Sequence, residues 1–214
     1  MKNFDCIIFD VDGTLTSTNN LIFSSFKFIA KKYLNKLISD EEIIANFGPP
    51  ENVILKKWCP EKFEEAKTDY FNYYANNHDI ASLHKGMDEI LVLIKERGAL
   101  AAVDTGKSSE ATRITLGKFD ILKYFNMVIT GDDVEKPKPS GEGILKIVDA
   151  LKLNKERTLM VGDSPVDVQA AKEAGVKMAA VLWDSYAADE VKTMKYDFLF
   201  NDSDELKNFL KENV

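Results

Sequence analysis

The stretch DCIIFDVDGT, residues 5–14, places a short apolar run directly before two aspartates. A nearly continuous apolar run of this length is typical of a parallel strand that is buried on both faces. Asp10 ends the run and Asp12 lies two residues further on, so in extended backbone both side chains face the same side. Gly13 then permits a tight backbone turn. The stretch therefore predicts a buried strand whose carboxyl end carries two neighbouring carboxylates.

Apolar runs and helical patterns alternate from Gly86 onward. We expect strands at 100–103, 127–129, 158–161, 178–182 and, more weakly, 197–200, and helices at 87–97, 109–116, 141–151, 166–174 and from 203 on. Gly175 is a typical residue to follow a helix end. Repeated alternation favours an α/β fold with helices on both faces of a parallel sheet. The predicted fold class is thus a doubly wound, Rossmann-like core that includes the strand at 5–9.

Residues 19–77 have a different character, with few strand-like runs and with apolar residues at roughly helical spacing. Ser39 and Glu42 form a capping-box pattern, and Cys59-Pro60-Glu61 opens a further helix. We therefore predict a small α-helical cap domain at 16–84, inserted into a core of 1–15 and 85–214. Gly48-Pro49-Pro50 breaks the helical pattern and is either an ordinary connection or a rigid loop that closes over a substrate.

The composition is that of an ordinary globular protein, with 45% hydrophobic and 29% charged residues. The net charge of -7 argues against a nucleic-acid binder, which would carry a basic face, but not against an anionic substrate. The two cysteines, Cys6 and Cys59, belong neither to a CxxC motif nor to a metal spacing, which fits a reducing, cytoplasmic compartment. Residues 1–9 resemble neither a signal peptide nor a membrane span.

Four polar clusters directly follow expected strands, and such strand ends meet at one edge of an open parallel sheet. They are Asp10-Val11-Asp12-Gly13-Thr14, Asp104-Thr105-Gly106, Lys136-Pro137, and Gly162-Asp163 with Asp167.

The carboxylates in these clusters suit metal-assisted chemistry. Asp10 and Asp12 repel each other unless a cation or a shared proton lies between them. One can stay ionised as a nucleophile while the other holds a proton as an acid. Asp163 and Asp167 complete a cluster of oxygen ligands of the kind that Mg²⁺ prefers. Taken alone, the last two would more often be acids in the first turn of a helix.

The remaining polar residues suit a phosphoryl group. Thr105 and the backbone amides that follow it, at Gly106, can hold phosphate oxygens. Lys136 supplies a positive charge, although in isolation it would more often be a solvated loop lysine. Phosphoryl transfer needs mainly positioning and charge neutralisation. Lys107 is either a contact for a leaving group or a solvated residue at a helix start.

These motifs, in this order, resemble the four motifs of the haloacid-dehalogenase superfamily: DVDGT after an apolar strand, a threonine at a strand end, KPKP, and GDSPVD. The helical insert resembles the cap of the subgroup that holds phosphoglycolate phosphatases, related pyrophosphatases and β-phosphoglucomutases. VGDSPVDVQAAKEAG and AVLWDSY are especially similar to the phosphoglycolate phosphatase branch. Ser17, Asp104 and Asp184 depart from the common pattern, which leaves the substrate open.

The resemblance implies a catalytic pair and two phosphate contacts. Asp10 would form an aspartyl-phosphate, and Asp12 would protonate the leaving group and then activate water. Thr105 would bind phosphate through its hydroxyl, beside the backbone of Gly13 and Gly106. Lys136, the first lysine of KPKP rather than the second, would neutralise the phosphoryl charge.

The resemblance also implies the metal ligands. Asp10, the Asp12 carbonyl and Asp163 would hold Mg²⁺, and Asp167 would support it directly or through water.

The expected function is a Mg²⁺-dependent phosphatase that acts on a small phosphorylated metabolite, with phosphoglycolate as the first candidate. The alternatives are a pyrophosphatase, a β-phosphoglucomutase-like phosphomutase or a non-catalytic binding module. The cap range 16–84 contains no arginine to hold a second phosphate, which favours a phosphatase over a mutase. Asp12 favours phosphate chemistry over dehalogenation. We expect a cytoplasmic monomer or homodimer that binds neither nucleic acid nor membrane.

Overall fold

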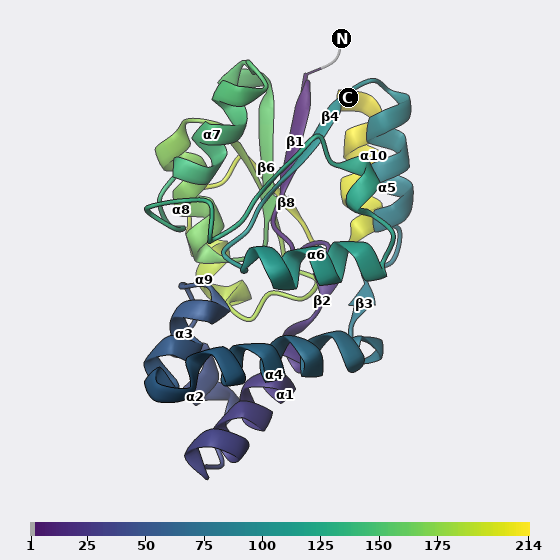
Figure 1. Cartoon of the computed structure of the whole chain (residues 1–214). Coiled ribbons are helices and arrows are strands. Elements are labelled where there is room, and N and C mark those ends of the chain that lie inside the picture. The colour runs from purple at the N-terminus through teal and green to yellow at the C-terminus, as the bar shows by residue number, and fades with distance from the viewer. Residues whose placement is uncertain (1–2) are drawn as a thin grey trace.

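A computed structural model describes residues 3–214 and shows a central sheet of six parallel strands in the order β5-β4-β1-β6-β7-β8 (Figure 1). The strands are β1 (Cys6–Phe9), β4 (Leu100–Asp104), β5 (Met127–Ile129), β6 (Thr158–Gly162), β7 (Lys177–Val181) and β8 (Phe198–Phe200). The first strand pairs with β4 on one side and with β6 on the other. The doubly wound sheet expected from the alternating pattern is confirmed.

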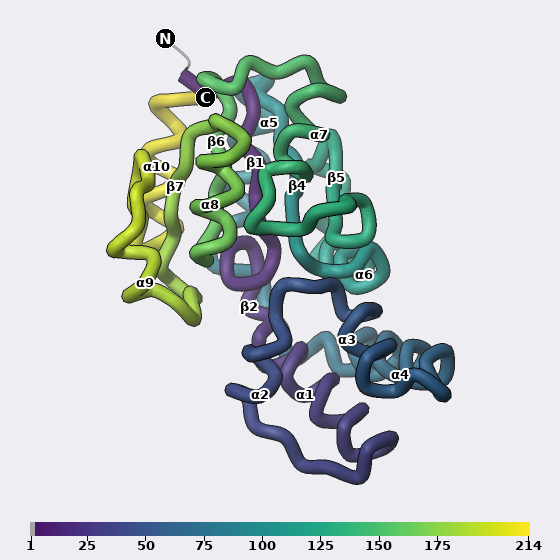
Figure 2. Tube along the Cα trace, turned by 90° about the vertical axis from the view of Figure 1, so that its left-hand side faces the viewer, coloured from purple at the N-terminus to yellow at the C-terminus, as the bar shows by residue number. Residues whose placement is uncertain are grey.

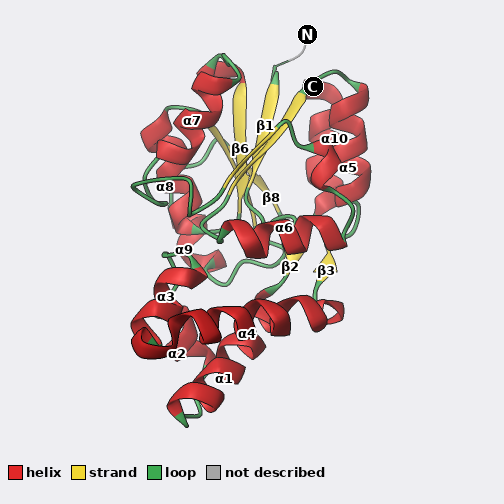
Figure 3. Ribbon diagram, in the orientation of Figure 1, coloured by secondary structure: helices red, strands yellow, loops and turns green. Residues whose placement is uncertain are grey.

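Helices cover both faces of this sheet (Figure 3). They are α5 (Met87–Glu96), α6 (Ser109–Lys118), α7 (Glu142–Ala150), α8 (Pro165–Ala174), α9 (Ala188–Thr193) and α10 (Ser203–Asn213). Ile7 and Phe9 of β1 pack with α5 and α10 in one apolar cluster, and Cys6 and Ile8 pack with α7 and α8 in another. Because successive side chains of a strand point to opposite faces of the sheet, this one apolar strand packs against the helices on both faces.

The chain between β1 and α5 forms a helical insert below the carboxyl ends of the strands (Figure 2). Its helices are α1 (Asn19–Ile29), α2 (Asp40–Ile44), α3 (Glu51–Trp58) and α4 (Phe63–Asn76), with a π-helical turn at Ala30–Leu34. Ser39 and Glu42 form the expected capping box. These helices bury their own aromatic cluster, which includes Phe26, Tyr70 and Tyr74 and extends to α6.

Two short strands, β2 (Thr16–Ser17) and β3 (Ser82–Leu83), carry the chain into and out of the insert. They pair antiparallel, with Thr16 opposite Leu83. The boundaries at 15/16 and 84/85 stay a prediction, and both lie directly beside this pair. No helix among residues 3–214 is both long and apolar enough to cross a membrane.

Candidate active site

Asp10 lies where β1 ends, at the edge of the sheet that faces the insert. Its backbone N–H donates to the Val161 carbonyl at 3.0 Å, which holds the residue to the neighbouring strand β6. Its side chain is buried, and the residue is only 8% exposed. A carboxylate so far removed from water needs a cation, a proton or hydrogen-bond donors close by.

Two further carboxylates lie close to Asp10. One carboxylate oxygen from each of Asp10, Asp163 and Asp167 lies within 4.8 Å of the other two. Thr14 Oγ1 donates to Asp163 at 2.8 Å, which orients that carboxylate. Gly13, with φ +82°, leaves the room that Asp163 needs, because a Cβ there would lie 2.5 Å from Asp163 Oδ2. Three buried oxygen donors within such a distance fit a hard divalent cation such as Mg²⁺.

Asp12 does not point its side chain into this group. Both of its carboxylate oxygens accept hydrogen bonds from Lys107 Nζ, at 3.1 and 3.0 Å, and one also accepts from Thr18 Oγ1. Of the four residues expected at the metal, only Asp12 therefore directs its carboxylate elsewhere, and the role of its carbonyl as a ligand stays a prediction. The two aspartates of DVDGT thus face different partners.

The lysine beside Asp10 is Lys138, and the prediction of Lys136 at this position is wrong. Lys138 Nζ donates to Asp10 Oδ1 at 2.8 Å, to Asp167 Oδ1 at 2.5 Å and to the Asp104 carbonyl at 3.1 Å. Lys136 is exposed, and its backbone N–H donates to Glu142 at 2.9 Å, near the start of α7. The loop therefore turns so that only the second lysine of KPKP reaches the carboxylates.

Burial and charge set the protonation of this cluster. Burial, opposed by Lys138, raises the pKa of Asp10 to about 7. Burial and the charges of Asp167 and Asp10 raise the pKa of Asp163 well above its usual range. Burial alone would lower the pKa of Lys138, but the surrounding carboxylates raise it, which keeps the ammonium charged. Without a cation these carboxyl groups therefore tend to keep protons, and a bound cation would favour their ionised form.

Thr105 and Gly106 follow β4 and line the same cavity as Asp10 and Lys138. Thr105 is 4% exposed, and its backbone N–H donates to the Ile129 carbonyl at 3.0 Å. Its hydroxyl oxygen accepts from the Lys107 backbone N–H at 3.3 Å. The hydroxyl hydrogen is free to be donated to a phosphate oxygen.

The cavity lies between the strand ends and the insert. Its volume is about 130 Å³, and from the insert it is lined by Asn19, Ile22, Phe26, Phe47, Gly48, Pro49, Glu51 and Ile54. Gly48-Pro49-Pro50 lies directly against the core. A Cβ on Gly106 would lie 3.5 Å from the Gly48 carbonyl oxygen, and a Cβ on Gly131 would lie 2.5 Å from Pro50 Cγ. The loop is therefore closed over the site.

Three residues at the site were not assigned from the sequence. Lys107 is 5% exposed, so the solvated interpretation of it is wrong. Burial alone would lower its pKa, but Asp12, Tyr74 and Glu51 raise it above the usual range. Asp104 is 3% exposed, and burial raises its pKa to about 6. Glu51, in the insert, had no sequence signal, because its partners come from the distant core.

A family model described as haloacid dehalogenase-like hydrolase matches residues 7–181. The pyrophosphatase PpaX of Halalkalibacterium halodurans is 33% identical over 201 residues, which are 94% of each chain.

Two solved structures share the fold. A structure described as a predicted phosphoglycolate phosphatase from Haemophilus somnus has a TM-score of 0.82 at 24% identity, and the match covers 98% of this chain and 99% of that one. CbbY from Rhodobacter sphaeroides, solved with phosphate, has a TM-score of 0.80 at 21% identity, over 95% of this chain and 96% of that one. Similarity at these identities shows the fold alone.

Proposed function

The chain belongs to the haloacid dehalogenase-like hydrolase family, and from this premise we propose that it is a Mg²⁺-dependent phosphatase. Its reaction would be hydrolysis of a small phosphate monoester through an aspartyl-phosphate, as in a phosphoglycolate phosphatase. The observation that carries the proposal is the convergence of Asp10, Lys138 and the Asp163–Asp167 pair at the carboxyl edge of the sheet. A nucleophile, a cation and a metal-binding group at one point are the parts that phosphoryl transfer requires.

The proposed chemistry has two steps. An oxygen of Asp10 attacks phosphorus, the bond to the leaving-group oxygen breaks, and Asp12 gives that oxygen a proton. Water then attacks the aspartyl-phosphate while Asp12 accepts a proton from it, which releases phosphate and regenerates Asp10. When bound by Asp10, Asp163 and Asp167, with the Asp12 carbonyl, Mg²⁺ would neutralise charge on the phosphoryl oxygens.

Lys138 would contribute a second positive charge to the transferring group. Its ammonium is already 2.8 Å from Asp10 Oδ1, so it needs no rearrangement to stabilise charge that develops between the nucleophile and phosphorus. Thr105 and Gly106, with Gly13 on the opposite loop, would hold the phosphoryl oxygens. This preorganisation supports a phosphotransfer role more strongly than a binding role.

The closed insert supports a small substrate, because a phosphorylated metabolite must fit between the Gly48-Pro49-Pro50 loop and the strand ends. A pyrophosphatase is the second candidate, and the observation that favours it is the similarity to PpaX along nearly the whole chain. We propose a cytoplasmic location, which the buried, free Cys6 and Cys59 support, since reduced thiols persist in a reducing compartment.

The decisive experiment is phosphate release from a panel that contains phosphoglycolate, pyrophosphate, hexose phosphates and nucleoside monophosphates, with Mg²⁺ and then with excess chelator. We expect release from one or a few compounds that the chelator abolishes. Phosphate release that persists in chelator would contradict the metal role. Silence across the panel with folded protein would favour the phosphomutase or a non-catalytic module.

A further inference from the structure

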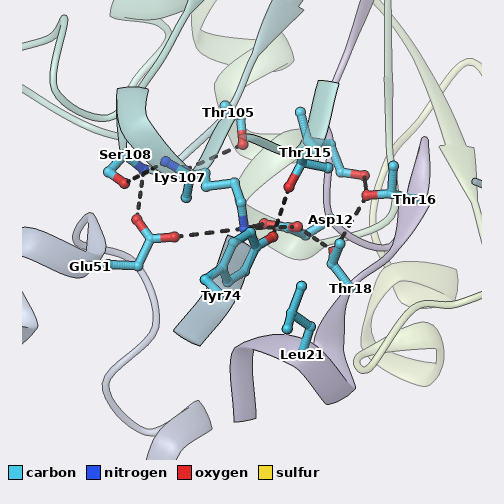
Figure 4. A network of polar contacts seen from close by, with 12 residues as sticks. Asp12, Thr16, Thr18, Leu21, Glu51, Tyr74, Thr105, Lys107, Ser108 and Thr115 are labelled. Carbon is cyan, nitrogen blue, oxygen red and sulfur yellow. Dashed lines mark hydrogen bonds and ion pairs between the residues drawn. The ribbon is translucent and has the colours of Figure 1, made fainter. Parts of the chain in front are cut away.

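Lys107 is almost fully enclosed at the start of α6, with a side chain that is only 1% exposed. Its ammonium contacts both oxygens of Asp12, lies 3.6 Å from Glu51 Oε1 and stands 4.9 Å from the centre of the Tyr74 ring (Figure 4). A buried ammonium is costly unless such partners replace its water. The side chain therefore has one position while all three partners are in place.

Two of the three partners belong to the insert. Glu51 is the first residue of α3, is 6% exposed, and also accepts the Ser108 backbone N–H at 2.7 Å. Tyr74 lies in α4, and its hydroxyl is 2.8 Å from Thr115 Oγ1 in α6. Insert and core thus meet around Lys107, and opening the insert would remove Glu51 and Tyr74 from the ammonium.

The third partner is the residue to which the proposed reaction assigns proton transfer. Lys107 donates to both oxygens of Asp12 and so restricts rotation of the carboxyl group about its last bond. Thr18 donates to Oδ1 from the start of the insert. Proton transfer is efficient only when the acid lies within hydrogen-bond reach of the leaving oxygen. The orientation of Asp12 therefore depends on Lys107.

We propose that Lys107 is a positioning residue that orients the carboxyl group of Asp12 toward the leaving group. Because Glu51 contacts Lys107 from the insert, this orientation depends on closure of the insert. The inference rests on the proposed phosphatase function and adds to it a physical link between substrate enclosure and proton transfer. With the insert open, Lys107 loses two partners and holds Asp12 less firmly. The acid is then correctly placed only when water is excluded from the cavity.

The test compares two leaving groups in Lys107→Met, which keeps an unbranched apolar side chain as far as Cε and removes the ammonium group. p-Nitrophenolate leaves without a proton, whereas the alkoxide of an alkyl phosphate needs one. We expect kcat/KM for the alkyl phosphate to fall about 100-fold and that for p-nitrophenyl phosphate by less than about 10-fold. This ratio reports formation of the aspartyl-phosphate and is independent of its later hydrolysis. Asp12→Asn should give the same selective pattern.

Three further variants serve as a conservative replacement, a second test of the same contact and a control. Lys107→Arg should recover part of the alkyl phosphate activity, because it restores a charged donor. Glu51→Gln should show a smaller loss with the same selectivity, and it serves as the readout should Lys107→Met fail to fold. Lys118→Met, on the exposed side of the same helix, should match wild type on both substrates.

The possible outcomes distinguish failure of the proposed role of Lys107 from failure of the proposed phosphatase function. Equal losses on both substrates in Lys107→Met and Glu51→Gln would show a merely structural role and overturn the inference. Unchanged kcat/KM values in both variants would overturn it as well. Wild-type protein that hydrolyses neither substrate nor any compound of the phosphate panel would instead refute the proposed function.

Discussion

At the scale of single residues, the sharpest contrast in the molecule is between two lysines of one tetrapeptide. Lys138 joins Asp10 and Asp167, whereas Lys136 is exposed. Lys138→Met should lower kcat by about 100- to 1,000-fold, because a preorganised charge at the phosphoryl group is lost. Without metal it should also destabilise the fold by about 3–5 kcal/mol, since buried carboxylates lose their cation.

Lys136→Met is the matched control, and kinetics and chemical denaturation of both variants make the measurement. The control should keep wild-type kcat and stability within about 0.5 kcal/mol. A large loss of kcat in Lys136→Met, with none in Lys138→Met, would restore the assignment made from the sequence.

The proposed nucleophile, Asp10, allows a second prediction at this scale. Asp10→Asn is nearly isosteric, and the neutral amide cannot form the acyl-phosphate, so turnover should fall by about 1,000-fold or more. Circular dichroism should show an unchanged fold. Activity near the wild-type level would remove Asp10 from its proposed role.

Some of these site residues could be predicted from the sequence and others could not. Asp10, Asp163 and Asp167 could be predicted to meet because each follows a strand of one parallel sheet. Lys136 and Lys138 could not be separated, because each precedes a proline and the direction of the loop decides which one points inward. Lys107 and Glu51 are close only because the insert folds back onto the core, and no local pattern encodes that contact.

At the scale of elements, the contact between the Gly48-Pro49-Pro50 loop and the core depends on a small residue. A Cβ at position 131 would lie 2.5 Å from both the Gly106 carbonyl oxygen and Pro50 Cγ. Gly131→Ala should therefore push the loop outward and lower kcat/KM by about 10-fold or more, because enclosure of the substrate is impaired.

The control is Gly117→Ala in α6, where a Cβ meets nothing within 4 Å. It should leave kcat/KM unchanged and stabilise the protein by about 0.5–1 kcal/mol, because glycine is a poor helix former. Steady-state kinetics of both variants measure kcat/KM, and chemical denaturation measures their stability. Wild-type kcat/KM in Gly131→Ala would mean that closure tolerates the extra methyl group.

Helices and strands with a strong apolar periodicity could be predicted from the sequence, whereas short elements could not. The six strands of the sheet and its long helices are confirmed within one or two residues, because burial on one or both faces leaves a strong periodic signal. Helix α9 (Ala188–Thr193) was missed because it is short and buries only Val191. Strands β2 and β3 were missed because a two-residue strand has no period to detect.

At the scale of the whole molecule, the carboxylate cluster couples stability to pH and metal. The pKa of Asp10 is raised from 3.8 to about 7, so at intermediate pH the folded protein holds a proton that the unfolded chain has released. Its contribution to metal-free stability therefore falls as pH rises through this window. Metal binding needs the ionised carboxylates, so stabilisation by Mg²⁺ should grow over the same window.

Thermal unfolding with and without Mg²⁺, at about pH 6 and about pH 8, tests this coupling. At a Mg²⁺ concentration 100 times the Kd at pH 8, the increase in Tm near pH 8 should be about 5–10 °C. The same concentration should give a smaller increase near pH 6, because the protonated carboxyl groups bind the metal less tightly. Asp163→Asn should lose most of the increase at both pH values. Equal increases at both pH values in the wild type would contradict the coupling.

The pairing of β2 with β3 has a consequence for how such a protein can change over time. Since Thr16 lies opposite Leu83, the insert leaves the core and returns to it at adjacent points. A segment with neighbouring ends can be lengthened, shortened or replaced without stretching the sheet that it interrupts. Recombination at this junction would therefore graft a new lid onto an unchanged reaction centre, and substrate preference could diversify while the chemistry is inherited intact.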